Sequence, residues 1–197
     1  TVLFLSRTMA TLYYINRLDH EVLQKRSHQF LIYNAIPFVV FFLIFVIWTF
    51  VSEGFAVNPD TGEIYMESMK YLNNLLELPI LLIVFIVGVL LVLYGIIISI
   101  LKPNYRKGIW FTGPGAILTV TILIFITGIN NTSFYPSVTD LQSSLTLQNA
   151  SSSKFTLNTM AWVSLFIPVV IGYIIYAWRA LEKTHTSLEE VKANKAY

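Results

Sequence analysis

Residues 79–129 read PILLIVFIVGVLLVLYGIIISILKPNYRKGIWFTGPGAILTVTILIFITGI, and this stretch decides the fold. Two long apolar runs flank a short basic segment, and neither run contains Asp, Glu, Lys, Arg or His. A helix rises about 1.5 Å per residue, so roughly 20 apolar residues are needed to cross the hydrocarbon core of a bilayer. Both runs reach that length. The stretch therefore predicts two transmembrane helices joined by a tight turn.

The same length test finds two further apolar runs elsewhere in the chain. Residues 1–16 are apolar as well, but that run is shorter and Arg7 interrupts it. We expect residues 1–16 to be the tail of a truncated transmembrane helix or, alternatively, a surface segment, and the chain to be a fragment of a longer protein. The sequence thus predicts an all-α, polytopic membrane helix bundle that forms one membrane domain. Its full spans are expected at residues 31–52, 79–101, 109–129 and 159–178.

The composition also indicates a membrane protein. Of the 197 residues, 55% are hydrophobic and 12% are charged, and the mean hydropathy is +0.66. A soluble domain of this length needs more polar surface to cover its core. The net charge of +2 is too small to indicate a nucleic-acid partner. Because the chain has no cysteine, disulfides, thiolate metal sites and cysteine nucleophiles are excluded.

Lysine and arginine are distributed unevenly between the two sides of the predicted spans. Eleven of the 13 basic residues fall on one side, and only Lys70 and Lys154 fall on the other. By the positive-inside rule the basic side is cytoplasmic. The expected cytoplasmic parts are the juxtamembrane segment 17–30, the turn 102–108 and the tail 179–197, and the expected outer loops are 53–78 and 130–158.

The outer loops contain local signals of their own. Apolar residues recur at nearly helical spacing in residues 63–78, which predicts a short amphipathic helix on the outer surface. The loop 130–158 is longer than most connections, so it is either functional or docked against a partner. Asn158 or Thr159 is expected to cap the last span.

Few side chains in the sequence are able to bind a cofactor. The histidines are His20, His28 and His185, all in segments that we expect to be cytoplasmic, and the spacing of His20 and His28 fits no ligand motif. Met160 lies in a span near the outer surface, where packing is a simpler role than haem ligation. We therefore expect no catalytic, cofactor-binding or metal-binding residue in this chain.

Three charged residues lie where a functional role has to be weighed. Glu53 and Glu77 stand at the outer ends of spans, where an ordinary interfacial or capping role is favoured over a role in proton exit. Arg7 lies inside an apolar stretch, where extension of its side chain to the cytoplasmic surface is favoured over pairing with a partner subunit or a lipid phosphate.

Helix breaks in the spans suggest one rival function. Gly113-Pro114-Gly115 and Pro168 interrupt or open helices, and paired breaks of this kind can mark the substrate site of a secondary transporter. Prolines are also ordinary in membrane helices, and that reading is favoured. A transporter needs polar groups at mid-membrane, and the spans offer only Asn34, Thr119, Thr121, Ser164 and similar side chains. A plain assembly or anchoring protein is a third possibility.

The C-terminal third carries a more specific pattern, FYPSVTDLQSSLTLQNASSSKFTLNTMAWVSLFIPVVIGYIIYAW, at residues 134–178. It resembles the C-terminal end of subunit II of cytochrome bd-type quinol oxidases. Weaker similarity extends upstream to Leu5 with Arg7-Thr8, to residues 54–57 and to residues 79–81. The elements of the resemblance are Phe134, Pro136-Ser137, Ser144-Leu145-Thr146, Ala150-Ser151-Ser152, Thr156-Leu157-Asn158, Met160, Trp162, Pro168, Tyr173 and Trp178.

This resemblance implies a place in a respiratory complex of the bacterial cytoplasmic (inner) membrane that oxidises quinol and reduces O2 to water. In that family subunit II has eight transmembrane helices in two halves, and this chain resembles the second half. Haems b and d and the quinol site belong to the partner, subunit I, so no cofactor is expected in this chain. The expected partners are that haem-bearing subunit, membrane lipid and quinone. The expected role is a non-haem scaffold that supports the oxidase.

Overall fold

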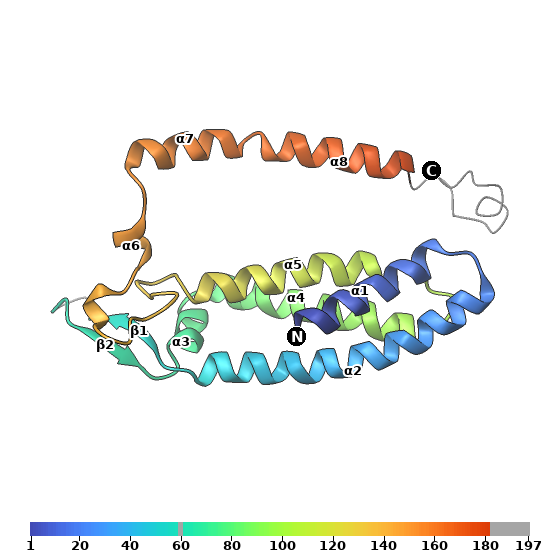
Figure 1. Cartoon of the computed structure of the whole chain (residues 1–197), viewed down its shortest axis with the longest axis horizontal. Coiled ribbons are helices and arrows are strands. Elements are labelled where there is room, and N and C mark those ends of the chain that lie inside the picture. The colour runs from blue at the N-terminus through green and yellow to red at the C-terminus, as the bar shows by residue number, and fades with distance from the viewer. Residues whose placement is uncertain (59–60, 182–197) are drawn as a thin grey trace.

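The computed structural model describes residues 1–58 and 61–181 and consists mainly of long helices (Figure 1). Helices α1, α2, α4 and α5 form a bundle, with a small hairpin and α3 at one end and the turns α1–α2 and α4–α5 at the other. The elements are α1 (Val2–Arg17), α2 (Glu21–Val51), β1 (Gly54–Val57), β2 (Ile64–Glu67), α3 (Lys70–Glu77), α4 (Pro79–Leu101), α5 (Ile109–Ile126), the 3-10 turn η1 (Leu141–Ser143), α6 (Leu147–Ala150), α7 (Lys154–Ser164) and α8 (Ile167–Leu181).

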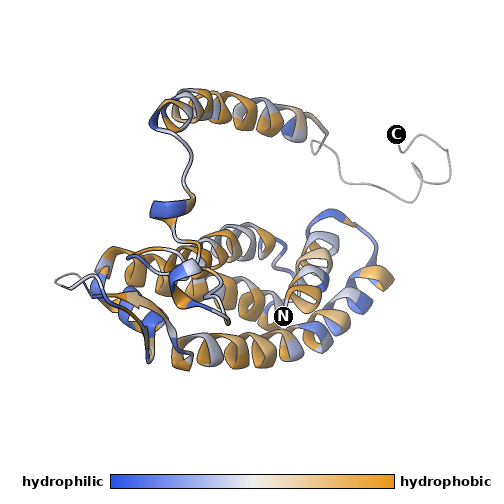
Figure 2. Cartoon of the chain, turned by 60° about the vertical axis from the view of Figure 1, so that its left-hand side comes forward, coloured by the Kyte–Doolittle hydropathy of each residue, from blue (hydrophilic) through white to orange (hydrophobic). Residues whose placement is uncertain are grey.

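The all-α membrane fold predicted from the sequence is confirmed. In the described part of the chain, four helical stretches are long and apolar enough to cross a membrane. Most of the residues in these helices are hydrophobic, as the colouring by hydropathy shows (Figure 2). The four stretches are Glu21–Val51, Pro79–Leu101, Ile109–Ile126 and Lys154–Ala180.

Helices α4 and α5 form the most extensively packed pair of the bundle. Helix α4 occupies the same residues as its apolar run, because Pro79 fits the first turn of a helix and Pro103 follows its C-terminal end. Helix α5 ends at Ile126, three residues before its apolar run does. Pro114 lies in the first two turns of α5, where the helix continues through it.

The first two helices extend further than the apolar pattern alone indicates. Helix α2 begins at Glu21, so most of the segment predicted as a separate cytoplasmic piece is the first part of one 31-residue helix. His20 caps this helix by accepting a hydrogen bond from the backbone N–H of Leu23. Helix α1 packs along α2 and buries Leu12 and Ile15 completely or nearly so. Residues 2–17 therefore belong to the bundle.

At the other end of the bundle, the prediction of an amphipathic helix over residues 63–78 is wrong in its first part. Residues 64–67 form strand β2, which pairs antiparallel with β1, and the helix is limited to Lys70–Glu77. Met69 has a φ of 56°, a left-handed conformation that separates the strand from the helix. Helix α3 still buries one face, including Tyr71 and Leu75.

The last span also starts earlier than the sequence suggested. Helix α7 begins at Lys154, and its cap is Ser153, whose hydroxyl accepts a hydrogen bond from Thr156 N–H. The expectation that Asn158 or Thr159 caps this span is therefore wrong. Pro168 has no N–H to donate to Ser164, and the helix is interrupted between α7 and α8. None of the most apolar part of this stretch is buried (Figure 1).

Candidate functional site: an apolar cavity inside the bundle

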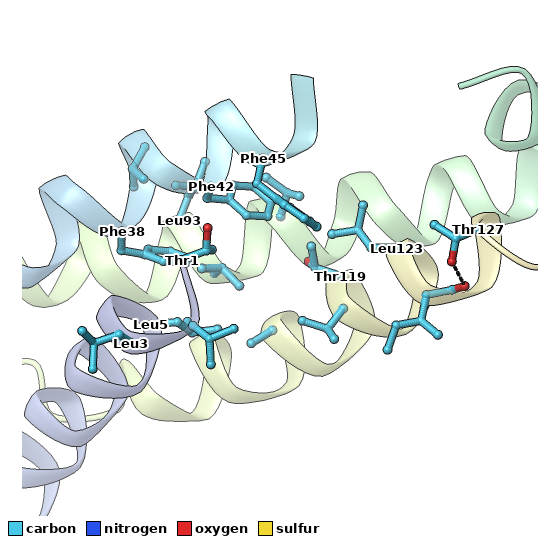
Figure 3. A pocket seen from close by; sticks show the side chains of 17 residues that line it. Thr1, Leu3, Leu5, Phe38, Phe42, Phe45, Leu93, Thr119, Leu123 and Thr127 are labelled. Carbon is cyan, nitrogen blue, oxygen red and sulfur yellow. Dashed lines mark hydrogen bonds between the residues drawn. The ribbon is translucent and has the colours of Figure 1, made fainter. Parts of the chain in front are cut away.

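A hollow of about 720 Å³ lies among α1, α2, α4 and α5 (Figure 3). Aromatic side chains from α2 and aliphatic side chains from α4 and α5 form its wall, and the first residues of α1 close one side. The labelled lining residues are Thr1, Leu3, Leu5, Phe38, Phe42, Phe45, Leu93, Thr119, Leu123 and Thr127.

The polar atoms in the wall of this cavity are already hydrogen-bonded. The hydroxyl of Thr119 donates to the carbonyl of Gly115 at 2.8 Å, and that of Thr127 donates to the carbonyl of Ile124 at 2.8 Å. The hydroxyl of Thr1 donates to the carbonyl of Phe41 at 3.1 Å. Since no ionisable side chain lines the cavity, its wall offers an environment for hydrocarbon.

The same pattern holds for polar side chains buried elsewhere in these helices. Each donates to the backbone carbonyl four residues earlier in its own helix, which satisfies the side chain without a partner from another helix. Within the described residues, no buried side-chain nitrogen or oxygen lacks a hydrogen-bond partner. The donors are Thr8, Thr11, Asn34, Ser99, Thr112 and Thr119.

The polar residues considered for a transporter site do not converge on one place. Asn34 and Thr119 are buried and bonded within their helices, whereas Thr121 and Ser164 are exposed on the outside of theirs. Ser164 donates to the carbonyl of Ala161. The structure thus provides no polar substrate site built from these four side chains.

Gly115, which follows Pro114, has a packing role that the sequence analysis missed. A Cβ atom built on Gly115 would lie 2.7 Å from the carbonyl oxygen of Gly88 on α4, whereas one built on Gly113 would meet only Met9, at 3.9 Å. Gly95 and Gly108 are similarly crowded by the facing helix. Small residues allow such close backbone approach between membrane helices. The spacing of these glycines along the sequence was the signal that could have indicated this close packing.

The histidines in the described residues act as hydrogen-bonding groups at the α1–α2 end. His20 caps α2, and His28 Nε2 lies 3.0 Å from the carbonyl oxygen of Pro103. His185 lies outside the described residues. Across residues 1–58 and 61–181, no three side chains of His, Cys, Asp and Glu cluster in a way that could hold a metal ion. Met160 is exposed on α7.

The charged residues singled out in the sequence lie apart from the cavity. Arg7 is exposed on α1, and Glu53 is exposed just before β1. Glu77 ends α3 and accepts a hydrogen bond from the side-chain amide of Asn130. The structure brings none of these three side chains together.

A buried amide next to Glu77 joins the outer elements to the bundle. Asn74 is completely buried, and its Nδ2 lies 2.9 Å from the carbonyl oxygen of Ile126 and 3.0 Å from the hydroxyl oxygen of Thr132. It thereby satisfies a carbonyl at the C-terminal end of α5 that has no partner within the helix. The sequence gives no indication of this contact, because it joins residues more than 50 positions apart.

Glu67 and Lys70 form an ion pair at the base of the hairpin. Lys70 Nζ lies 2.9 Å from Glu67 Oε2, and Asn73 donates to the other carboxylate oxygen at 2.7 Å. Partial burial acts to raise the pKa of Glu67, but the hydrogen bonds from Asn73 and Lys70 and the charge of Lys70 outweigh it, so the pKa lies below its ordinary value. Burial raises the pKa of the neighbouring Tyr71.

These features define a class: a multi-pass α-helical membrane protein whose buried polar groups are used for packing. The chain belongs to a known family, because the family of cytochrome bd terminal oxidase subunit II matches residues 1–181. Similar curated proteins include cytochrome bd-I ubiquinol oxidase subunit 2 of Escherichia coli strain K12 and of Escherichia coli O157:H7. Each is 33% identical over 125 residues, which cover 62% of this chain and 32% of the relative.

Proposed function

We propose that this chain is a non-haem scaffold portion of subunit II in a bd-type terminal quinol oxidase. In this role it supports a haem-bearing subunit I, which oxidises quinol and reduces O2 to water. Family membership over residues 1–181 is the observation that carries the proposal. The long apolar helices of the described chain are consistent with a place in such a membrane complex.

The scaffold role has a physical basis in the packing of the helices. The close contact of α4 and α5 produces a stiff hairpin, and α1 and α2 pack beside it. Helices α7 and α8 present an apolar surface that the other described residues of this chain leave uncovered. That surface is available to the partner subunit or to lipid. Electron transfer then belongs to haems b and d in the partner, while this chain contributes position and an apolar surrounding.

The proposed location is the bacterial cytoplasmic membrane, with the α1–α2 and α4–α5 turns and the C-terminus in the cytoplasm. The excess of basic residues at that end supports this orientation. The hairpin, α3 and the loop 130–153 then lie on the outer side. Labelling of single cysteines is a direct check of sidedness, because the chain has no cysteine of its own. A reagent that cannot cross the membrane should label a cysteine at Val138 in intact cells and should not label one at Asn104.

The function is tested by purifying the full-length parent of this chain from its native membrane through an affinity tag. We expect a haem-bearing subunit to co-purify, with haem absorption and quinol-dependent O2 uptake in the same fraction. The matched control is the same tag on an unrelated multi-pass protein of that membrane. An intact native complex that contains this chain and shows no haem spectrum would refute the proposal.

A further inference from the structure

The turn between α4 and α5 is held against the junction of α1 and α2. Asn16 Nδ2 donates to the carbonyl of Arg106 at 2.9 Å, and the guanidinium of Arg106 donates to the Asp19 carboxylate at 2.8 Å. The ring of His28 contacts the carbonyl of Pro103. These contacts hold segments about 75–90 residues apart in sequence at one end of the bundle (Figure 1).

This end of the bundle has an excess of positive charge. Residues 16–28 and 102–107 contain six lysines and arginines but only two acidic residues, and one of these, Asp19, is paired with Arg106. Four basic side chains here are exposed and, among the residues that the structure describes, have no carboxylate oxygen within 4.0 Å. We call them the basic face: Lys25, Arg26, Lys102 and Lys107.

The basic face adjoins the ends of the apolar helical runs, where lipid headgroups are expected. Lys102 directly follows the last residue of α4, and Lys107 stands two residues before the start of α5. Arg26 precedes the apolar part of α2, which starts at Leu31, by about one and a half helical turns. Exposed Trp110 is in the first turn of α5, as expected at a membrane–water interface.

The opposite end of the bundle has more acidic than basic residues among those that the structure describes. Its described charged residues around the hairpin, α3 and the outer loop are mostly acidic, and Lys70 is buried in the ion pair with Glu67. The basic face is therefore a feature of one end and one leaflet. The described acidic residues of the outer end are Glu53, Glu63, Glu67, Glu77 and Asp140.

We propose that the basic face binds the phosphate groups of anionic phospholipids. Phosphate is the anion present at this depth, and clusters of Lys and Arg next to membrane helices attract anionic headgroups. Basic side chains that only set the orientation of the chain in the membrane would not need to lie close together. Here, hydrogen bonds hold the α4–α5 turn, which carries Lys102 and Lys107, against the end of the bundle that carries Lys25 and Arg26. The proposal rests on this geometry and is independent of the function proposed above.

The expected effect follows from the number of charges. Each Lys or Arg near an anionic surface strengthens attachment about fivefold. Lys25→Gln with Arg26→Gln should therefore weaken binding of anionic lipid roughly 25-fold, and neutralisation of the whole basic face should weaken it by a hundredfold or more. The matched control is Lys154→Gln, because Lys154 is exposed at the outer end of α7.

The test uses the complex that contains this chain, purified in detergent and titrated with phosphatidylglycerol, phosphatidylcholine or inorganic phosphate while native mass spectrometry counts the bound molecules. Size-exclusion chromatography verifies that each variant remains assembled. We expect phosphatidylglycerol to bind more tightly than phosphatidylcholine. Its affinity should fall about fivefold for each charge removed and should be unchanged in Lys154→Gln.

Four results would overturn the proposal. The first is equal binding of the two lipids. The second is retention of phosphatidylglycerol by an assembled variant that lacks all four charges. The third is displacement of the lipid by millimolar inorganic phosphate, which would assign the face to a free anion. If Lys154→Gln lost as much binding as the double variant, the effect would be one of total charge and the assignment to this face would fail.

Discussion

Substitution of Gly115 by alanine tests how closely α4 packs against α5, the most extensively packed pair of helices in the bundle. The added Cβ would lie 2.7 Å from the carbonyl oxygen of Gly88 and 2.8 Å from both the backbone nitrogen of Val92 and the Cβ of Leu91. Ordinary contact of this kind begins near 3.4 Å. Two of the three neighbours are backbone atoms, so the helices themselves must separate by several tenths of an ångström.

Gly113→Ala is the matched control, because it makes the same chemical change two residues away in the same helix. Its Cβ would meet only the end of the flexible Met9 side chain, at 3.9 Å. Alanine is favoured over glycine in a helix by about 1 kcal/mol in both variants, and this gain cancels in the comparison. Overpacking typically costs about 1–3 kcal/mol, so Gly115→Ala should be less stable than Gly113→Ala by that amount.

The assay is unfolding of the purified protein in mixed detergent and SDS micelles, followed by circular dichroism. Gly113→Ala should be as stable as the natural protein or slightly more stable, and Gly115→Ala should unfold at a lower SDS fraction. Equal stability of the two variants would show that α4 and α5 do not approach as closely as described, and the reasoning from the glycine contacts would be refuted.

Three further perturbations address other elements of the structure. Asn74→Ala should destabilise the protein by about 1–3 kcal/mol in the same assay, because it leaves the carbonyl of Ile126 at the end of α5 without this donor. Exposed Asn104→Ala should have no effect, and equal stability of both variants would contradict the role of Asn74. Because the pKa of Glu67 is lowered on folding, the ionised carboxylate stabilises the protein above the ordinary pKa of 4.5, and this stabilisation is lost as the pH falls through the pKa of the folded state. Glu67→Gln should abolish this part of the acid sensitivity. An unchanged dependence of stability on pH below 4.5 in this variant would exclude a contribution from Glu67. Pro168→Leu should restore a donor to the carbonyl of Ser164 and slow hydrogen exchange of amides between α7 and α8; unchanged exchange would show that proline is not the cause of the break.

The apolar runs were sufficient to predict the long helices, because membrane helices satisfy their own backbone and follow a length rule. Helix α4 illustrates this, since Pro79 and Pro103 mark its ends in the sequence itself. Strand β2 could not be predicted in this way, because its pairing with Gly54–Val57 is between separate segments and its apolar spacing is compatible with a helix. The wrong cap on the last span has a related cause, because Ser153 and Asn158 both have the chemistry of a cap.

The interior of the bundle was less predictable than its outline. The crowding of Gly115 by α4 depends on which face of α5 turns toward its neighbour, which composition does not specify. Asn74 appears in the sequence as one polar residue on a surface helix, but it is completely buried against the end of α5. Asn34 and Thr119, two of the side chains considered for a transporter site, are buried and bonded within their own helices, which only the structure reveals.

The central claim is that no histidine or methionine of this chain ligates haem, and the most direct test is the haem content of the purified complex after each of these residues is replaced. These are His20, His28 and His185 and the methionines Met9, Met66, Met69 and Met160. Each is replaced singly, with His→Gln or Met→Leu, and haem is quantified per assembled complex by its absorption spectrum. The scaffold role predicts the full haem content and an unchanged spectrum in every variant. Loss of one haem in any assembled variant would contradict it.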